Sequence, residues 1–156
     1  MRIPARSGLA SFLIAIWILP VTAGQMLILT AGLTGLLPEV EFSSLSQRDP
    51  NPLGEKALAL HPEQWKHGET EHFIYHFFDG YVVTPISVEA EFHYRVVAME
   101  LQRDQPAGDT KSHIYVFQRP ADWQQFQTVG RLEKWTGGIH SQGSLFILRD
   151  SSFKFR

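Results

Sequence analysis

The amino-acid sequence predicts an α+β protein in which an N-terminal transmembrane helix is followed by a small domain of mixed β-sheet and helices. Two observations lead to this prediction. No charged residue occurs between Ser7 and Pro38, and this run exceeds the roughly 20 mostly apolar residues that a helix needs to cross a bilayer. Beyond it, short aromatic and β-branched segments alternate with helical ones, which is typical of a sheet with helices packed on it.

The charges that flank the uncharged run predict its orientation. Arg2 and Arg6 precede the run, whereas Glu39 and Glu41 follow it. Because cytoplasmic flanks carry an excess of Lys and Arg, we expect a cytoplasmic N-terminus. The chain would then be a single-pass membrane protein whose bulk, after Pro38, is extracytoplasmic. Its first partner would be the membrane lipid bilayer.

A cleaved signal peptide is the alternative interpretation of the same segment. Leu9–Leu19 would be its apolar region, Pro20 the helix breaker and Val21–Ala23 the cleavage site, and the mature protein would be secreted. Apolar sequence resumes at once with Met26–Leu29, which a cleaved protein would leave exposed. This continuation favours an uncleaved anchor.

Composition excludes several classes of function. Arg2 and Arg6 are two of the 14 basic residues, so 12 basic and all 16 acidic residues follow Pro38, a formal charge of −4. Nucleic acid is therefore not expected as a partner, because binding it requires a cationic surface. The chain has no cysteine, which excludes disulfides, thiolate zinc sites and a cysteine nucleophile.

The chain after Pro38 divides into a linker and a domain. Four prolines and glycines punctuate residues 39–67, where only Lys56–Leu60 favours a short helical turn. We therefore predict a cytoplasmic N-terminus and anchor at 1–38, a linker at 39–67 and an extracytoplasmic α+β domain at 68–156. The domain is expected to be incomplete, because the chain ends just after an apolar strand.

Within the domain, a strand is predicted at 71–78 and a helix from Thr84, as N-cap, and Pro85 to about Arg103. The residues of this helix that we expect to pack on the sheet are Phe92, Val96 and Met99.

Three further elements follow this helix. Ser112–Phe117 is predicted to be a strand, and Pro120 opens a short helix that Gly130 ends. A glycine-rich loop then leads to Ser144–Leu148, which is apolar on both faces and is typical of a strand buried between two layers.

The seven histidines were the first candidates for chemistry. His72 and His76 lie on a predicted strand, where four residues span about 13 Å, too far for one metal ion. Glu89 and His93 share a helix face but supply only two ligands. The motifs H-E-x-x-H and G-x-S-x-G, a phosphate loop and a dinucleotide fingerprint are absent from the sequence. No residue is assigned a catalytic or metal-binding role.

The order of elements in the second half of the chain forms a loose pattern, made by His72–Phe77, Val88–Leu101, Ile114–Phe117, Asp122–Trp123, Phe126, Gly138 and Leu145–Leu148. This pattern resembles the N-terminal half of peptidase MA-like domains, which are exported or membrane-associated relatives of the gluzincin zinc metallopeptidases. The resemblance implies an incomplete zincin N-terminal half.

The same resemblance implies that the last strand borders a substrate cleft. The residues whose backbone would offer that edge to a protein or peptide are Ser144, Leu145, Phe146, Ile147 and Leu148. The helix that carries H-E-x-x-H in the family is missing from this chain, so zinc would be a cofactor only if such a segment followed downstream. The expected function is a membrane-anchored, metallopeptidase-like extracytoplasmic domain that is inactive as given. A small anchored extracytoplasmic binding or scaffold domain without enzymatic activity is the alternative.

Overall fold

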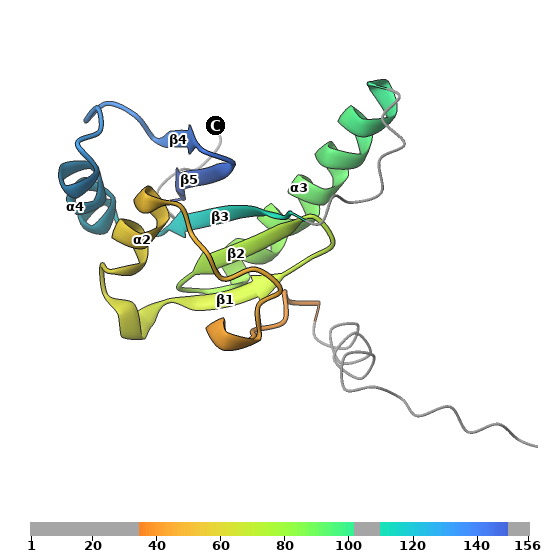
Figure 1. Cartoon of the computed structure of the whole chain (residues 1–156), viewed down its shortest axis with the longest axis horizontal. Coiled ribbons are helices and arrows are strands. Elements are labelled where there is room, and N and C mark those ends of the chain that lie inside the picture. Colours follow the sequence, from red (N-terminus) through yellow and green to blue (C-terminus); the bar gives the residue numbers. More distant parts are fainter. Residues whose placement is uncertain (1–34, 102–109, 150–156) are drawn as a thin grey trace, which may run out of the picture.

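A computed structural model describes residues 35–101 and 110–149, which form a five-stranded mixed sheet with helices on both faces (Figure 1). The strands are β1 (Lys66–Glu69), β2 (Phe73–Phe77), β3 (Ser112–Phe117), β4 (Gly138–Ser141) and β5 (Ser144–Leu148). The helices are α2 (Pro52–Leu58), α3 (Gly80–Glu100) and α4 (Pro120–Gly130), with short 3-10 turns η1 (Phe42–Ser44) and η2 (Pro62–Gln64). The predicted α+β domain with a mixed sheet is confirmed.

The strand order is β1-β2-β3-β5-β4, with β2, β3 and β5 parallel and the outer strands β1 and β4 antiparallel to their neighbours. In the central strand β3, five of six residues are buried, as expected for a strand covered on both faces. The predicted strands at 71–78, 112–117 and 144–148 correspond to β2, β3 and β5. Strand β4 lies where a loop was expected.

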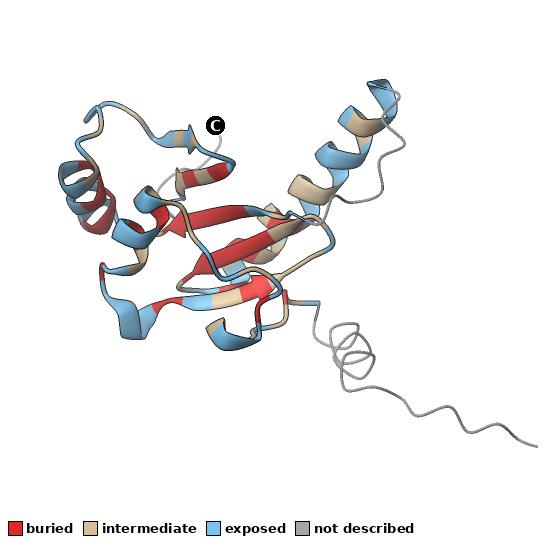
Figure 2. Ribbon diagram, viewed as in Figure 1, coloured by how far each residue is buried: buried red, intermediate tan, exposed pale blue. Residues whose placement is uncertain are grey.

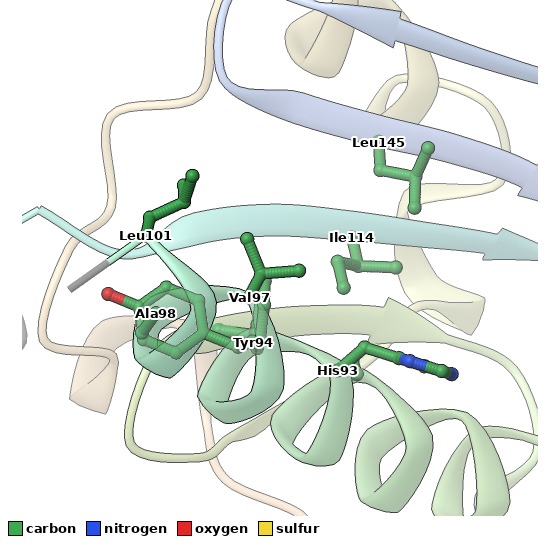
Figure 3. Close-up of a pocket in the computed structure, with 9 residues that line it drawn as sticks. His93, Tyr94, Val97, Ala98, Leu101, Ile114 and Leu145 are labelled. Atoms are coloured by element: carbon green, nitrogen blue, oxygen red, sulfur yellow. The ribbon is translucent and has the colours of Figure 1, made fainter. Parts of the chain in front are cut away.

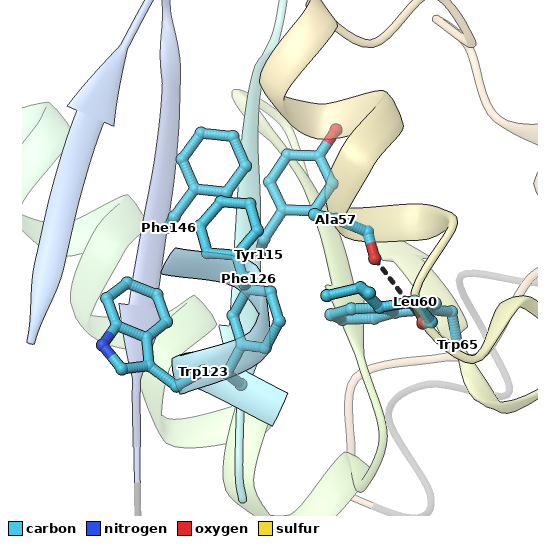
Figure 4. Packing of buried hydrophobic residues seen from close by; sticks show 8 residues of the cluster. Ala57, Leu60, Trp65, Tyr115, Trp123, Phe126 and Phe146 are labelled. Carbon is cyan, nitrogen blue, oxygen red and sulfur yellow. Dashed lines mark hydrogen bonds between the residues drawn. The ribbon is translucent and has the colours of Figure 1, made fainter. Parts of the chain in front are cut away.

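Side chains of β3 and β5 alternate between two cores, one on each face of the sheet. Figure 2 shows that the central strands are largely buried. The core between the sheet and α3 contains Leu37, Tyr75, Phe77, Val83, Ile114 and Val116. The core beneath α2 and α4 contains Ala57, Leu60, Trp65, Tyr115, Phe117, Trp123, Phe126 and Phe146 (Figure 4).

The segment expected to be a linker is folded onto the sheet. Trp65 is buried, and its indole Nε1 donates hydrogen bonds to the carbonyl oxygens of Leu60 (2.8 Å) and Ala57 (3.2 Å) (Figure 4). Asn51 caps α2 by accepting a hydrogen bond from the Gly54 amide at 2.8 Å. Residues 39–67 therefore contribute helices, a strand and core side chains, and do not form a spacer.

The membrane part of the prediction is corrected by the structure. Across residues 35–101 and 110–149, none of the helices has both the length and the apolar character that crossing a bilayer requires. Residues 7–34 of the uncharged run lie outside the described residues. The described end of the run, residues 35–38, is not helical. There Leu37 is buried in the α3 core, and its amide donates to Thr84 Oγ1 at 2.8 Å. The transmembrane helix, the single-pass membrane localisation and the extracytoplasmic placement are left without support.

Helix α3 also differs from its prediction. It begins at Gly80, because the Asp79 side chain caps it by accepting a hydrogen bond from the Tyr81 amide at 2.9 Å. Its buried face is formed by Val83 and Ser87. The expectation that Phe92, Val96 and Met99 pack on the sheet is wrong for Phe92 and Met99, which are 62% and 70% exposed. Val96 is partly buried but is not among the residues that pack against the α3 core. The last turns of α3 extend beyond the strands (Figures 1 and 2), and Val97, Met99 and Leu101 there are 54%, 70% and 60% exposed.

Candidate functional site

An apolar groove lies between the C-terminal half of α3 and strands β3 and β5 (Figure 3). Its volume is about 460 Å³. The described residues that line it are Phe73, Ala90, His93, Tyr94, Val97, Ala98, Leu101, Ile114 and Leu145.

One wall of the groove is a helical stripe. Tyr94, Val97, Ala98 and Leu101 follow the i, i+3, i+4, i+7 spacing that places side chains on one face of a helix. Val97 and Leu101 remain 54% and 60% exposed. Figure 3 shows Val97 pointing from α3 toward Ile114 on the sheet. The stripe therefore presents apolar surface that the described part of the chain only partly covers.

Aromatic contacts fix the base of this wall. The Tyr94 ring stacks on His72 with centroids 3.8 Å apart and meets Phe73 edge-on at 5.9 Å. His72 is held in turn by Glu91, because His72 Nδ1 lies 2.6 Å from Glu91 Oε2. The groove wall is thus positioned before any ligand binds.

The chemistry of the groove favours an apolar ligand. None of its described lining residues carries a carboxylate or an ammonium group, and His93 is the one imidazole among them. Binding pockets of about 300–1,000 Å³ with mostly apolar walls and a few polar groups are typical of ligand sites. The groove has this size and lining.

Glu71, His72 and Glu91 form a second cluster beside the groove. Their candidate ligand atoms lie within 4.8 Å of one another, an arrangement that could hold a metal ion. However, Glu91 Oε1 already accepts hydrogen bonds from Thr70 Oγ1 (2.6 Å) and the His72 amide (2.9 Å). Burial raises the pKa of Glu91, but the hydrogen bonds from Thr70 and His72 outweigh it and lower the pKa below its usual range. The hydrogen bonds of Glu91 therefore hold the segment that precedes β2 to α3, while Glu71 pairs with Arg95 at 3.4 Å.

Three other histidines meet on the opposite face of the sheet. His67 Nδ1 lies 2.8 Å from His76 Nδ1, and His76 Nε2 lies 2.9 Å from His113 Nδ1. We call these three residues the histidine row. The sequence does not predict this row, because β1 was not predicted and because the strand register that brings His67 opposite His76 cannot be read from one strand alone.

The structure separates the histidine pair considered in the sequence. His72 contacts Glu91 on the α3 side, whereas His76 belongs to the histidine row on the α2 and α4 side. His93 lines the groove without a role in a metal cluster of the described residues.

The predicted substrate edge at Ser144, Leu145, Phe146, Ile147 and Leu148 is not an edge in the structure. These residues form β5, which pairs with β3 on one side and β4 on the other. Their backbone is therefore already hydrogen-bonded within the sheet, so a peptide could pair with β5 only by displacing a neighbouring strand. Only the Leu145 side chain contributes to the groove.

The fold and groove define a small α+β domain with a mixed sheet and an apolar groove on one face. No protein-family model, curated protein or solved structure matches this chain. Neither these comparisons nor the described residues support the peptidase or metallopeptidase-like character that the resemblance implied.

Proposed function

We propose that this domain is a binding module that holds an apolar helix of a partner protein in the groove between α3 and strands β3 and β5. The observation that carries the proposal is the stripe of Tyr94, Val97, Ala98 and Leu101, which faces an apolar sheet surface across open space. Recognition of an amphipathic helix by such a groove is one of the recurring modes of peptide binding.

The spacing of the stripe favours a helix over an extended peptide. Side chains at i, i+3, i+4 and i+7 form ridges that interlock with the ridges of a second helix. Ala90 and Ala98 are small, which allows the backbone of a partner helix to approach closely. A strand would instead require unpaired backbone groups, and neither β3 nor β5 offers them.

Burial of the exposed apolar side chains would supply the binding energy. Fully burying a large aliphatic side chain is worth roughly 1.5–3 kcal/mol. Val97 and Leu101 are 54% and 60% exposed, so each would gain somewhat more than half of this on docking. The absence of charge among the described lining residues means that little polar surface would need to be desolvated.

Site-specific photocrosslinking in the native host tests the proposal. A photoreactive amino acid at Val97 is expected to capture a partner whose crosslinked peptide is an amphipathic helix, and Leu145→Asp should abolish the crosslink. The matched control position is Val88, which is 65% exposed on the same helix but outside the groove. Crosslinks of equal yield from both positions, or adducts of a small apolar molecule only, would contradict a helix-binding groove.

A further inference from the structure

The histidine row is buried although histidine is polar. His76 has no exposed surface and His113 is 6% exposed, while His67 lies half-buried at one end. His76 also stacks on Tyr115 with centroids 4.4 Å apart. When all three rings are neutral, each N···N contact pairs one N–H with one lone pair, so both hydrogen bonds are satisfied.

Residues 42–51, which we call the strap, cross the sheet over this row. At one end the Phe42 ring meets His67 edge-on at 5.1 Å and lies 6.3 Å from His76. At the other end Asn51 Nδ2 donates to the Ser141 carbonyl oxygen at 2.9 Å. Figure 1 shows this segment running from η1 across the strands to α2.

Between these ends the strap is attached beside His113. The Ser46 amide donates to Glu69 Oε2 at 3.0 Å, and Gln47 Oε1 accepts from the Lys111 amide at 2.9 Å. Leu45 is buried. Both of these hydrogen bonds involve side chains, whereas a backbone ladder joins the strands to one another, so the strap can separate from the sheet at a smaller cost than the strands can separate from one another.

We propose that the histidine row and the strap form an acid-sensitive latch, in which protonation of the row releases the strap while the sheet stays folded. One added proton leaves both N···N hydrogen bonds intact but places a full charge among buried rings. A second proton leaves one N···N contact with two donors and no acceptor, which breaks it. Release of the strap lifts Phe42 from His67 and His76 and lets water reach the charged rings.

The surroundings of the three histidines determine the pH at which the latch responds. Burial lowers the pKa of all three histidines, and for His76 the charges of His67 and His113 lower it further. Glu69 opposes this by raising the pKa of His113. The other titratable groups that face the row include two ion pairs, Lys111 with Glu69 and Lys66 with Glu39. The carboxylates of Glu41 and Glu63 line a cavity with His67, and the Tyr115 ring stacks on His76.

Hydrogen exchange of the full chain at pH 7.5 and pH 5.0, corrected for the intrinsic exchange rates, tests the latch. The amides of Leu45 and Ser46 are expected to lose protection by about tenfold or more, the effect of one pKa unit. The amides of β3 and β5 should change by less than about threefold. Equal loss of protection in strap and sheet, or no loss in either, would overturn the proposal.

Two variants separate the latch from general acid sensitivity. H76Q and the double variant H67Q/H113Q should both keep the strap protected at pH 5.0, while H140Q, which alters an exposed histidine on β4, should respond like the wild type. Retention of the tenfold loss in the double variant would overturn the latch. If H76Q does not fold, an NMR titration of the imidazoles in the wild-type protein replaces it. The pH at which His67, His76 and His113 are protonated should equal the pH at which the strap opens, and a difference between the two would overturn the latch.

Discussion

Gly54 shows how a single residue can be constrained by a distant contact. In a helix, glycine costs roughly 1 kcal/mol relative to alanine, so the sequence of α2 suggests that Gly54→Ala would stabilise it. In the structure, a Cβ atom at Gly54 would overlap the Tyr115 hydroxyl and lie 2.9 Å from Tyr115 Cζ. Tyr115 is completely buried and stacks between His76 and Phe146, so its ring cannot move aside.

We therefore expect Gly54→Ala to lower the free energy of unfolding by about 1–3 kcal/mol, the usual cost of overpacking a core. Denaturant unfolding monitored by tryptophan fluorescence measures this loss. Tyr115→Phe in the same background should recover part of it by removing the overlapping hydroxyl. Gly137→Ala is the control, because a Cβ there meets open space. A Gly54→Ala variant as stable as the wild type would show that α2 can shift away from the sheet.

At the scale of elements, helix α3 has two halves with different surroundings. Val83 and Ser87 in the first half are buried against the sheet, and Thr84 joins the helix to the segment at Leu37. In the second half, large apolar residues are exposed, and some of them line the groove. Apolar residues occur all round this helix, so its pattern alone does not tell which face is buried.

This difference predicts that two truncations in α3 change the free energy of unfolding by different amounts. Val83→Ala removes two methyl groups from a completely buried site and should cost about 1–3 kcal/mol of unfolding free energy. Phe92→Ala should stay within about 0.5 kcal/mol, because its side chain is largely exposed. Both values come from denaturant titrations of the purified variants. A larger loss of stability for Phe92→Ala than for Val83→Ala would instead mean that the helix face with Phe92 packs on the sheet, as the sequence predicted.

At the scale of the whole molecule, the histidine row links stability to pH. The folded-state pKa of His67, His76 and His113 is lowered, so the unfolded chain, with histidine pKa near 6.5, binds more protons below that pH. Stability that is fully present above about pH 6.5 is therefore lost as the pH falls toward the folded-state values. The pKa of Glu69 and Glu91 is also lowered, so the stability that these carboxylates contribute is lost only at pH values near or below 4.5.

The free energy of unfolding should thus fall between pH 7.5 and pH 5.0, by about 1.4 kcal/mol per pH unit for each extra proton that the unfolded chain binds. Urea unfolding at a series of pH values, followed by tryptophan fluorescence, measures the slope. H67Q/H113Q should flatten it, whereas H140Q should leave it unchanged. A stability that rises on acidification would mean that the row gains favourable charge interactions when protonated.

The sequence by itself determined the strands β2, β3 and β5, the helix α4 and the mixed α+β class. A short apolar or aromatic run between turn residues must be buried whatever it packs against, so it can be recognised from the sequence alone. It could not predict β1 and β4, the folding of residues 39–67 or the buried face of α3. Hydropathy predicted an anchor at Ser7–Pro38, yet the part of that run within the structure places Leu37 in the domain core. The histidine row and the groove likewise arise only where segments far apart in sequence pack together. Their positions depend on strand register and on which side chains cover which surface, and both are set by tertiary contacts.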